Sequence, residues 1–91
     1  MPRVQFTQHL RRFFPGLQDG PVEGASLSQV FAALERAHPG LAGYLLDDQG
    51  ALRKHVNVFL DDELVARERA RLEDPLAPGV TVSIFQALSG G

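Results

Sequence analysis

Residues 80–91 have the sequence VTVSIFQALSGG, which ends in two glycines. In its first half the apolar residues Val80, Val82 and Ile84 occupy every second position, and the polar Thr81 lies between two of them. Successive side chains of a strand point to opposite faces of a sheet, so this pattern predicts a strand with one face in the core. The glycine pair then follows directly after this strand.

A second alternating segment lies earlier in the chain, where Val56, Val58 and Leu60 share one phase. Residues 61–63 are Asp-Asp-Glu, and short acidic side chains of this kind favour a turn. The segment therefore predicts a hairpin that returns as a brief strand at residues 64–65.

The N-terminal part of the chain predicts two further strands and a helix. Residues 3–10 alternate like a strand, and a turn at residues 19–21 precedes a short antiparallel strand at residues 22–25. Ser26 is a good N-cap, and the apolar stripe after it predicts an amphipathic helix that ends by Pro39. The stripe consists of Leu27, Val30, Phe31 and Leu34. Such a helix is suited to lie across a sheet.

Two connections are longer than turns. Residues 40–54 hold glycines and aspartates around a short apolar cluster, which predicts one packed turn within a long loop. Residues 67–73 are charged and are expected to be mostly solvated, with Leu72 as an anchor. This order of elements predicts an α+β fold, in which one main helix lies on one face of a mixed sheet of four to five strands.

Composition limits the classes of function. The chain has 91 residues, 44% hydrophobic and 22% charged, which predicts a single domain over residues 1–91. It has no cysteine, which excludes a disulfide, a thiolate nucleophile and an iron–sulfur cluster. The formal net charge of −2 is spread along the chain, unlike the basic surface that nucleic acid or an anionic membrane attracts. No apolar stretch approaches the roughly 20 residues that span a bilayer, and the first residues lack a signal-peptide core. We therefore expect a cytoplasmic protein that binds neither nucleic acid nor membrane.

The sequence contains no motif of a known catalytic or metal site. His9, His38 and His55 are far apart, and none has the spacing of a metal ligand to another histidine or an acid. The pairs Asp47-Asp48 and Asp61-Asp62 lie beside turn residues, where aspartate bonds the local backbone. Neither a phosphate-binding glycine loop nor a nucleophile elbow occurs. We expect no catalytic residue and no metal in this chain.

The end of the chain is the first candidate site. From Leu88 onward the last four residues, fully extended, reach about 13 Å beyond the sheet. Glycine has no side chain to clash with a narrow cleft, so Gly90 and Gly91 could bring the terminal carboxylate to a reactive group elsewhere. A frayed end is the alternative, because termini are often disordered and rich in small residues.

Two phenylalanines form the second candidate site. If the alternating apolar residues of their strands face the helix, Phe59 and Phe85 point to the sheet face without a helix. Together with Leu88 they would form an exposed apolar patch at the root of the tail, and such patches often mark partner sites. The alternative is that residues 40–54 or 67–73 cover the two rings.

Several features occur in a set order along the chain. Strand, strand, helix and long loop lead to the segment LRKHVNVFLDDE at residues 52–63, then to DPL at residues 74–76, Pro78-Gly79 and the end ALSGG. In this combination the chain resembles the MoaD/ThiS family of ubiquitin-like β-grasp sulfur carriers. The resemblance covers essentially the whole chain and implies a β-grasp fold.

The resemblance also implies a chemistry for the tail. In this family an E1-like enzyme uses ATP to adenylate the terminal carboxylate, and sulfur then replaces the adenylate. Gly91 would carry the sulfur as a thiocarboxylate, while Gly90 and Ser89 would thread the partner's cleft within a flexible tail at residues 88–91. ATP would be bound by the partner, and this chain would hold no permanent cofactor.

Docking residues and partners follow from the same resemblance. Phe59, Phe85 and Leu88 would bind the E1-like adenylating enzyme and a sulfur-accepting enzyme, such as a molybdopterin-synthase large subunit or a cysteine-synthase-like enzyme. The free carrier is expected to be a monomer, because it must move between partners. The alternative is a ubiquitin-like protein modifier or a non-catalytic interaction module, and Lys54 is the only lysine available for chains of such a modifier.

Overall fold

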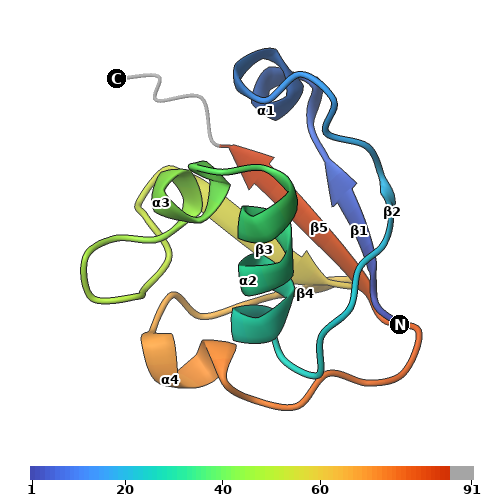
Figure 1. The fold of residues 1–91 in the computed structure, drawn as a ribbon. Coiled ribbons are helices and arrows are strands. Elements are labelled where there is room, and N and C mark those ends of the chain that lie inside the picture. Colours follow the sequence, from blue (N-terminus) through green and yellow to red (C-terminus); the bar gives the residue numbers. More distant parts are fainter. Residues whose placement is uncertain (87–91) are drawn as a thin grey trace.

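Strand β5 (Thr81–Gln86) lies in the middle of a five-stranded sheet within residues 1–86, the part of the chain that the structure, a computed structural model, describes. The strand order is β2-β1-β5-β3-β4 (Figure 1). β5 pairs in parallel with β1 and antiparallel with β3, so the sheet is mixed, as predicted. The predicted hairpin is present as β3 and β4, but its return strand lies one residue earlier than the predicted residues 64–65, because Glu63 already pairs with Leu60. The other strands are β1 (Arg3–Phe6), β2 (Gly20–Pro21), β3 (Val56–Leu60) and β4 (Glu63–Leu64).

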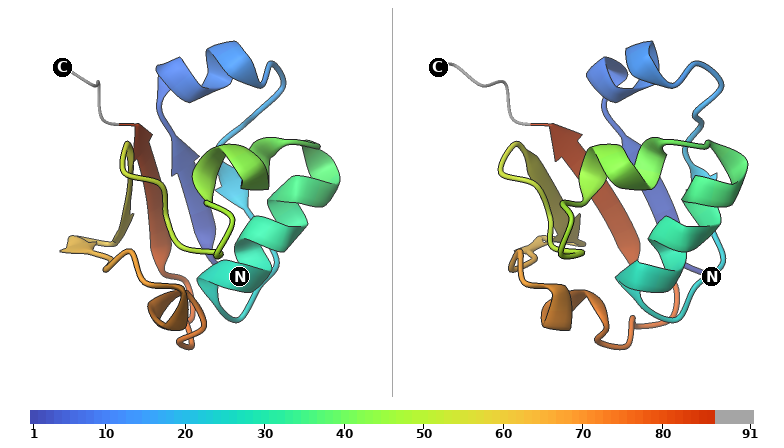
Figure 2. Two further views of the ribbon diagram at one scale, coloured as in Figure 1. Left: turned by 90° about the vertical axis from the view of Figure 1, so that its left-hand side faces the viewer. Right: turned by 60° about the vertical axis from the view of Figure 1, so that its left-hand side comes forward.

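Helix α2 (Leu27–Ala37) is the predicted main helix, and it crosses one face of the sheet (Figure 2). Helix α3 (Leu41–Leu45) is the packed turn predicted inside the long connection, and it continues the same layer. Two short helices, α1 (Gln8–Phe13) and α4 (Arg69–Leu72), were not predicted. Among residues 1–86 no helix is long and apolar enough to cross a membrane.

The core lies between the sheet and α2. Ser26 begins the helix as predicted, because its side-chain oxygen accepts a hydrogen bond from the backbone N–H of Gln29 at 3.3 Å. The side-chain amide oxygen of Gln29 accepts a hydrogen bond from the backbone N–H of Ala25 at 2.8 Å. In a regular capping box this bond comes from the N–H of the N-cap residue itself, so here it is displaced by one residue. The predicted stripe of α2 is buried together with the alternating residues of β1, β3 and β5: Leu27, Val30, Phe31, Leu34, Val4, Phe6, Val56, Val58, Val82 and Ile84.

The first strand is shorter than the sequence predicts. β1 ends at Phe6, and the prediction of one strand over residues 3–10 is wrong beyond that point. Thr7 caps α1, because its hydroxyl oxygen accepts a hydrogen bond from the N–H of Leu10 at 3.4 Å. Phe6 and Leu10 are four residues apart, so strand alternation and helical periodicity place them on the same side, and both are buried. The apolar pattern alone therefore did not separate the two structures.

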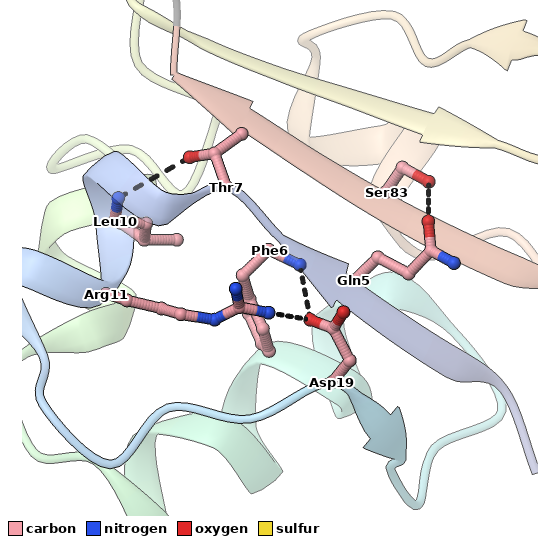
Figure 3. A network of polar contacts seen from close by, with 7 residues as sticks. All are labelled: Gln5, Phe6, Thr7, Leu10, Arg11, Asp19 and Ser83. Atoms are coloured by element: carbon pink, nitrogen blue, oxygen red, sulfur yellow. Dashed lines mark hydrogen bonds and ion pairs between the residues drawn. The ribbon is translucent and has the colours of Figure 1, made fainter.

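Asp19 fixes the junction between β1 and α1 from the neighbouring connection. Its carboxylate accepts hydrogen bonds from the backbone N–H of Phe6 at 2.9 Å and from the guanidinium of Arg11 at 2.6 Å (Figure 3). One carboxylate thus contacts the last residue of the strand and the middle of the helix. The orientation of α1 against the sheet is held by this contact and by the cap.

The second strand is also displaced from its predicted position. The sequence predicts it at residues 22–25, whereas β2 is Gly20–Pro21, antiparallel to β1. The chain then leaves the sheet and passes close to the start of α2. A Cβ atom added at Gly24 would lie 2.7 Å from the backbone nitrogen of Val30, so this approach requires glycine and does not continue a strand.

Glu35 connects α2 to α3. Its carboxylate accepts hydrogen bonds from the backbone N–H groups of Gly40 and Ala42, each at 2.9 Å. These two bonds hold the pKa of Glu35 below its usual value, because they favour the charged form of the carboxyl group. The bond from Gly40 has the larger effect. The contact fixes the start of α3, which carries Tyr44.

Arg67 anchors the segment that enters β3, within residues 67–73, which the sequence predicts to be mostly solvated. Its half-buried guanidinium donates to the carbonyl oxygens of Arg53 and, at 2.6 Å, of Val56, and to the side-chain oxygen of Asn57 at 2.7 Å. These bonds satisfy backbone acceptors where the chain turns into the strand. Leu72 of α4 is buried, which confirms the predicted anchor.

We predict that Arg67→Ala lowers the free energy of unfolding by about 2–3 kcal/mol, because partly buried acceptors lose a charged donor. Arg71→Ala is the matched control. The Arg71 guanidinium pairs with Glu63 at 3.3 Å and Asp74 at 2.7 Å on the surface, and its loss should cost at most about 1 kcal/mol. Urea unfolding of both variants measures the difference. Equal losses would show that Arg67 does not anchor β3.

Candidate functional site

The end of β5 is the point from which the predicted tail leaves the fold. Gln86, the last residue of β5, is paired with Val56 of β3, and Ile84 is paired with Phe6 of β1. Both neighbours therefore hold β5 almost to its end. A central strand with partners on each side has no free edge, so its end is a fixed point of the structure.

Four of the predicted site residues follow this point. Leu88, Ser89, Gly90 and Gly91 lie outside the described residues 1–86. The extended tail and its role stay predictions, and so does the part of Leu88 in docking.

The two phenylalanines are together on the sheet face opposite α2, as the alternation predicts. The rings of Phe59 and Phe85 meet edge to face, with their centroids 5.6 Å apart. Phe85 is 44% exposed, and Phe59 is half-buried. Neither long connection covers Phe85, so the alternative that these segments bury both rings is wrong.

Leu64 enlarges this surface and was not recognised from the sequence. It is paired with Phe59 across the hairpin, and paired residues share a face. Its side chain is 57% exposed, a high value for a leucine. The register of the hairpin was the signal that could have found it, because one residue of shift decides which face Leu64 occupies. We call Phe59, Leu64 and Phe85 the apolar patch.

Acidic residues border the apolar patch. Asp61 turns the hairpin with a φ of 54° in the left-handed region, and its side-chain oxygen accepts from the N–H of Thr81 at 3.1 Å. The turn role predicted for this pair of aspartates is thereby confirmed at Asp61. Asp62 and Glu63 follow and are exposed. Asp61 and Asp62 line one shallow hollow with Phe59 and Phe85, so the patch combines two rings with negative charge.

Four aromatic side chains form a second surface at the end of the sheet where β5 stops. The centroids of His9 and Phe13 are 5.4 Å apart, those of Phe13 and Tyr44 are 5.6 Å apart, and those of Tyr44 and His55 are 5.5 Å apart. These rings come from α1, from α3 and from the residue before β3. We call His9, Phe13, Tyr44 and His55 the aromatic ridge. Sequence reasoning missed it, because its members are distant in the chain.

The titratable groups of residues 1–86 form no metal-binding cluster. No three histidine, aspartate or glutamate side chains of this part of the chain gather in a way that could hold an ion. His9 and His55 belong to one ridge, but Phe13 and Tyr44 lie between them.

Comparison with known proteins gives the same fold. A model of the ThiS family matches residues 4–91. The structure of CysO, an antigen of Mycobacterium tuberculosis, is 28% identical with a TM-score of 0.80, and the match covers 97% of this chain and 100% of that chain. SAMP1 from Haloferax volcanii is 27% identical with a TM-score of 0.72, covering 99% and 98%. A chain of the BexX/CysO complex from Amycolatopsis orientalis is 24% identical with a TM-score of 0.81, and each chain is covered fully. No curated protein matches the chain. The predicted ubiquitin-like β-grasp fold is confirmed.

We predict that Phe85→Ser changes the free energy of unfolding by less than about 1 kcal/mol, because much of the ring is already in water. Ile84→Ala, one residue away on the core face, is the matched comparison. Ile84 is 1% exposed, and its truncation should cost about 2–4 kcal/mol through the cavity that it leaves. Thermal or urea unfolding measures both. A large loss from Phe85→Ser would mean that this ring is part of the core and is not available for docking.

Proposed function

The chain belongs to the ThiS family, and from that membership we propose that it is a sulfur carrier whose Gly91 carboxylate is converted to a thiocarboxylate. The observation that carries the proposal is the family match, which covers residues 4–91 and so includes the glycine pair at residues 90–91. The fold then has one task, which is to hold and present a carboxylate.

The proposed chemistry has two steps. A carboxylate oxygen of Gly91 attacks the α-phosphorus of ATP, an acyl–phosphate bond forms, and the bond to pyrophosphate breaks. Hydrosulfide then attacks the carbonyl carbon, the carbon–oxygen bond to AMP breaks, and the thiocarboxylate remains. A free carboxylate is a poor acyl donor, so adenylation supplies the leaving group.

The side chains of this protein are consistent with catalysis by a partner. The chain has no cysteine, so sulfur cannot be carried as a persulfide on a side chain. We propose that an E1-like enzyme binds ATP and adenylates Gly91, while Gly90 and Ser89 occupy its cleft. The carrier then contributes a docking surface and a carboxylate, and no catalytic residue.

The apolar patch supports docking to such enzymes. Phe59, Leu64 and Phe85 present apolar area on β3, β4 and β5, on the face that α2 leaves open. Exposed aromatic rings in the centre of an interface often dominate its binding energy. The same patch would meet the sulfur-accepting enzyme, a molybdopterin-synthase large subunit or a cysteine-synthase-like enzyme. We propose that the free carrier is monomeric and acts in the cytoplasm.

A protein modifier is the second candidate. This candidate is favoured by the match to SAMP1 from Haloferax volcanii, because the full name of that protein is small archaeal modifier protein 1. In this role the activated Gly91 carboxyl would form an amide with a lysine of a target. Lys54, the only lysine of the chain, is exposed and would be the one branch point for linked copies.

The intact mass of the protein tests the proposal. After co-expression with the E1-like enzyme of the source organism and a supply of sulfide, we expect a species heavier by the difference between sulfur and oxygen. Fragmentation should place the change on Gly91. Deletion of Gly91 should abolish it, whereas Arg36→Gln, at an exposed position of α2, should not.

Two results would contradict the sulfur-carrier proposal. One is a wild-type mass that stays unchanged although AMP and pyrophosphate are released. The other is a set of covalent adducts between Gly91 and protein lysines with no thiocarboxylate, which would support the modifier instead.

A further inference from the structure

The aromatic ridge is not used by the proposed chemistry or by the apolar patch. We propose that it is a second docking surface, which fits the rim of the partner cleft that receives the tail, and that this rim carries acidic and apolar side chains. This inference rests on the proposed function, because it takes the tail to enter a cleft of the E1-like enzyme.

Position is the first argument. β5 ends at Gln86, between β1 and β3. His9 and Phe13 lie on α1, which follows β1 and packs against β5, and His55 directly precedes β3. The ring of Tyr44 lies between those of Phe13 and His55 and joins the two sides. Five residues follow β5, so a cleft that holds the last of them must bring its rim close to this end of the sheet.

Exposure and rigidity are the second argument. Phe13 is 56% exposed although it is a large apolar residue. Its helix is fixed by Thr7 and by the contact between Asp19 and Arg11. Phe13 is thus exposed but held in place, next to three half-buried rings, which lowers the entropy that a partner must remove on binding.

The other side of the ridge is held equally well. Glu35 fixes the start of α3, which carries Tyr44. The Nε of Arg53 donates to the carbonyl oxygen of Gly43 at 2.9 Å, which connects α3 to the segment that carries His55. Both halves of the ridge therefore have defined supports in the described part of the chain.

Charge is the third argument, and it decides the chemistry of the partner. Residues 7–16 and 51–60, which contribute three of the four rings, contain no acidic residue. Arg12 and Lys54 are exposed in these segments. Asp47 lines one hollow with Lys54 and His55, but its side-chain oxygen accepts from the N–H groups of residues 49 and 51 within its own turn. The ridge thus has a basic border, whereas the apolar patch has an acidic one.

A protein rim fits this surface better than nucleic acid does. Aromatic rings with basic neighbours also occur where single strands bind, but such sites have a groove lined with cations that follows the backbone. Here two exposed cations border the ridge, in a chain with a net charge of −2. Acidic side chains around an apolar contact would complement these two cations and favour encounter at low salt.

The experiment measures binding of the carrier to the E1-like enzyme of the source organism in the absence of ATP, by calorimetry. We expect Phe13→Ser to weaken the affinity about tenfold, as for an exposed aromatic anchor. Phe13→Tyr, which keeps the ring, should restore affinity to within about threefold of wild type. Circular dichroism of each variant checks that the fold is intact.

A charge variant tests the acidic rim. Arg12→Glu combined with Lys54→Glu should weaken binding about tenfold at low salt, and the loss should shrink as salt screens the pairs. Arg36→Glu is the matched control, because Arg36 is exposed on α2, which carries none of the four rings. It should leave the affinity unchanged.

The outcomes separate this inference from the proposed function. Wild-type affinity in Phe13→Ser and in the double charge variant overturns the inference, even if Gly91 is thiocarboxylated normally. Failure of the wild type to bind the enzyme also overturns it. If binding is normal and depends on the ridge but Gly91 is not adenylated, the proposed function is overturned and the ridge is still supported as a docking surface. Binding of a single-stranded RNA oligonucleotide, or self-association that Phe13→Ser abolishes, would assign the ridge to another partner.

Discussion

The pairing of β5 on both of its edges is the constraint on which the rest of the structure depends. Its parallel ladder with β1 extends from Arg3 opposite Thr81 to Phe6 opposite Ile84, and its antiparallel ladder with β3 extends to Gln86. Two ladders fix one register, and a slip of one residue would exchange the faces of the strand. The same register buries Ile84 and exposes Phe85, so it defines the core, the apolar patch and the exit of the tail together.

The two surfaces differ in chemistry. Asp61 and Asp62 line a hollow with the two rings of the apolar patch, while Arg12 and Lys54 are exposed in the segments that carry the aromatic ridge. A partner that holds the tail and touches both surfaces would need basic groups on one side and acidic groups on the other. Such an arrangement orients the carrier as well as binding it, because a reversed approach places like charges together.

Alternation and capping predicted much of this fold from the sequence. The period-2 pattern located β5 and β3, Ser26 located the start of α2, and the parity of the strands placed Phe59 and Phe85 outside the core. Local ambiguity explains the errors near the N-terminus, since Phe6 and Leu10 satisfy a strand and a helix equally. The role of Arg67 and the aromatic ridge were not predictable, because they depend on contacts between segments that only the folded chain brings together.

A change of one residue in the chain after β5 tests the constraint most directly. Deletion of Ala87 keeps residues 88–91 but draws the Gly91 carboxylate back toward the sheet by about 3.4 Å. If β5 fixes the point from which the tail reaches its partner, pyrophosphate exchange at saturating enzyme should fall about hundredfold or more, because reacting atoms tolerate little displacement. Affinity for the E1-like enzyme through the patch and the ridge should change much less. An unchanged exchange rate would contradict the claim that the fold sets the reach of the carboxylate.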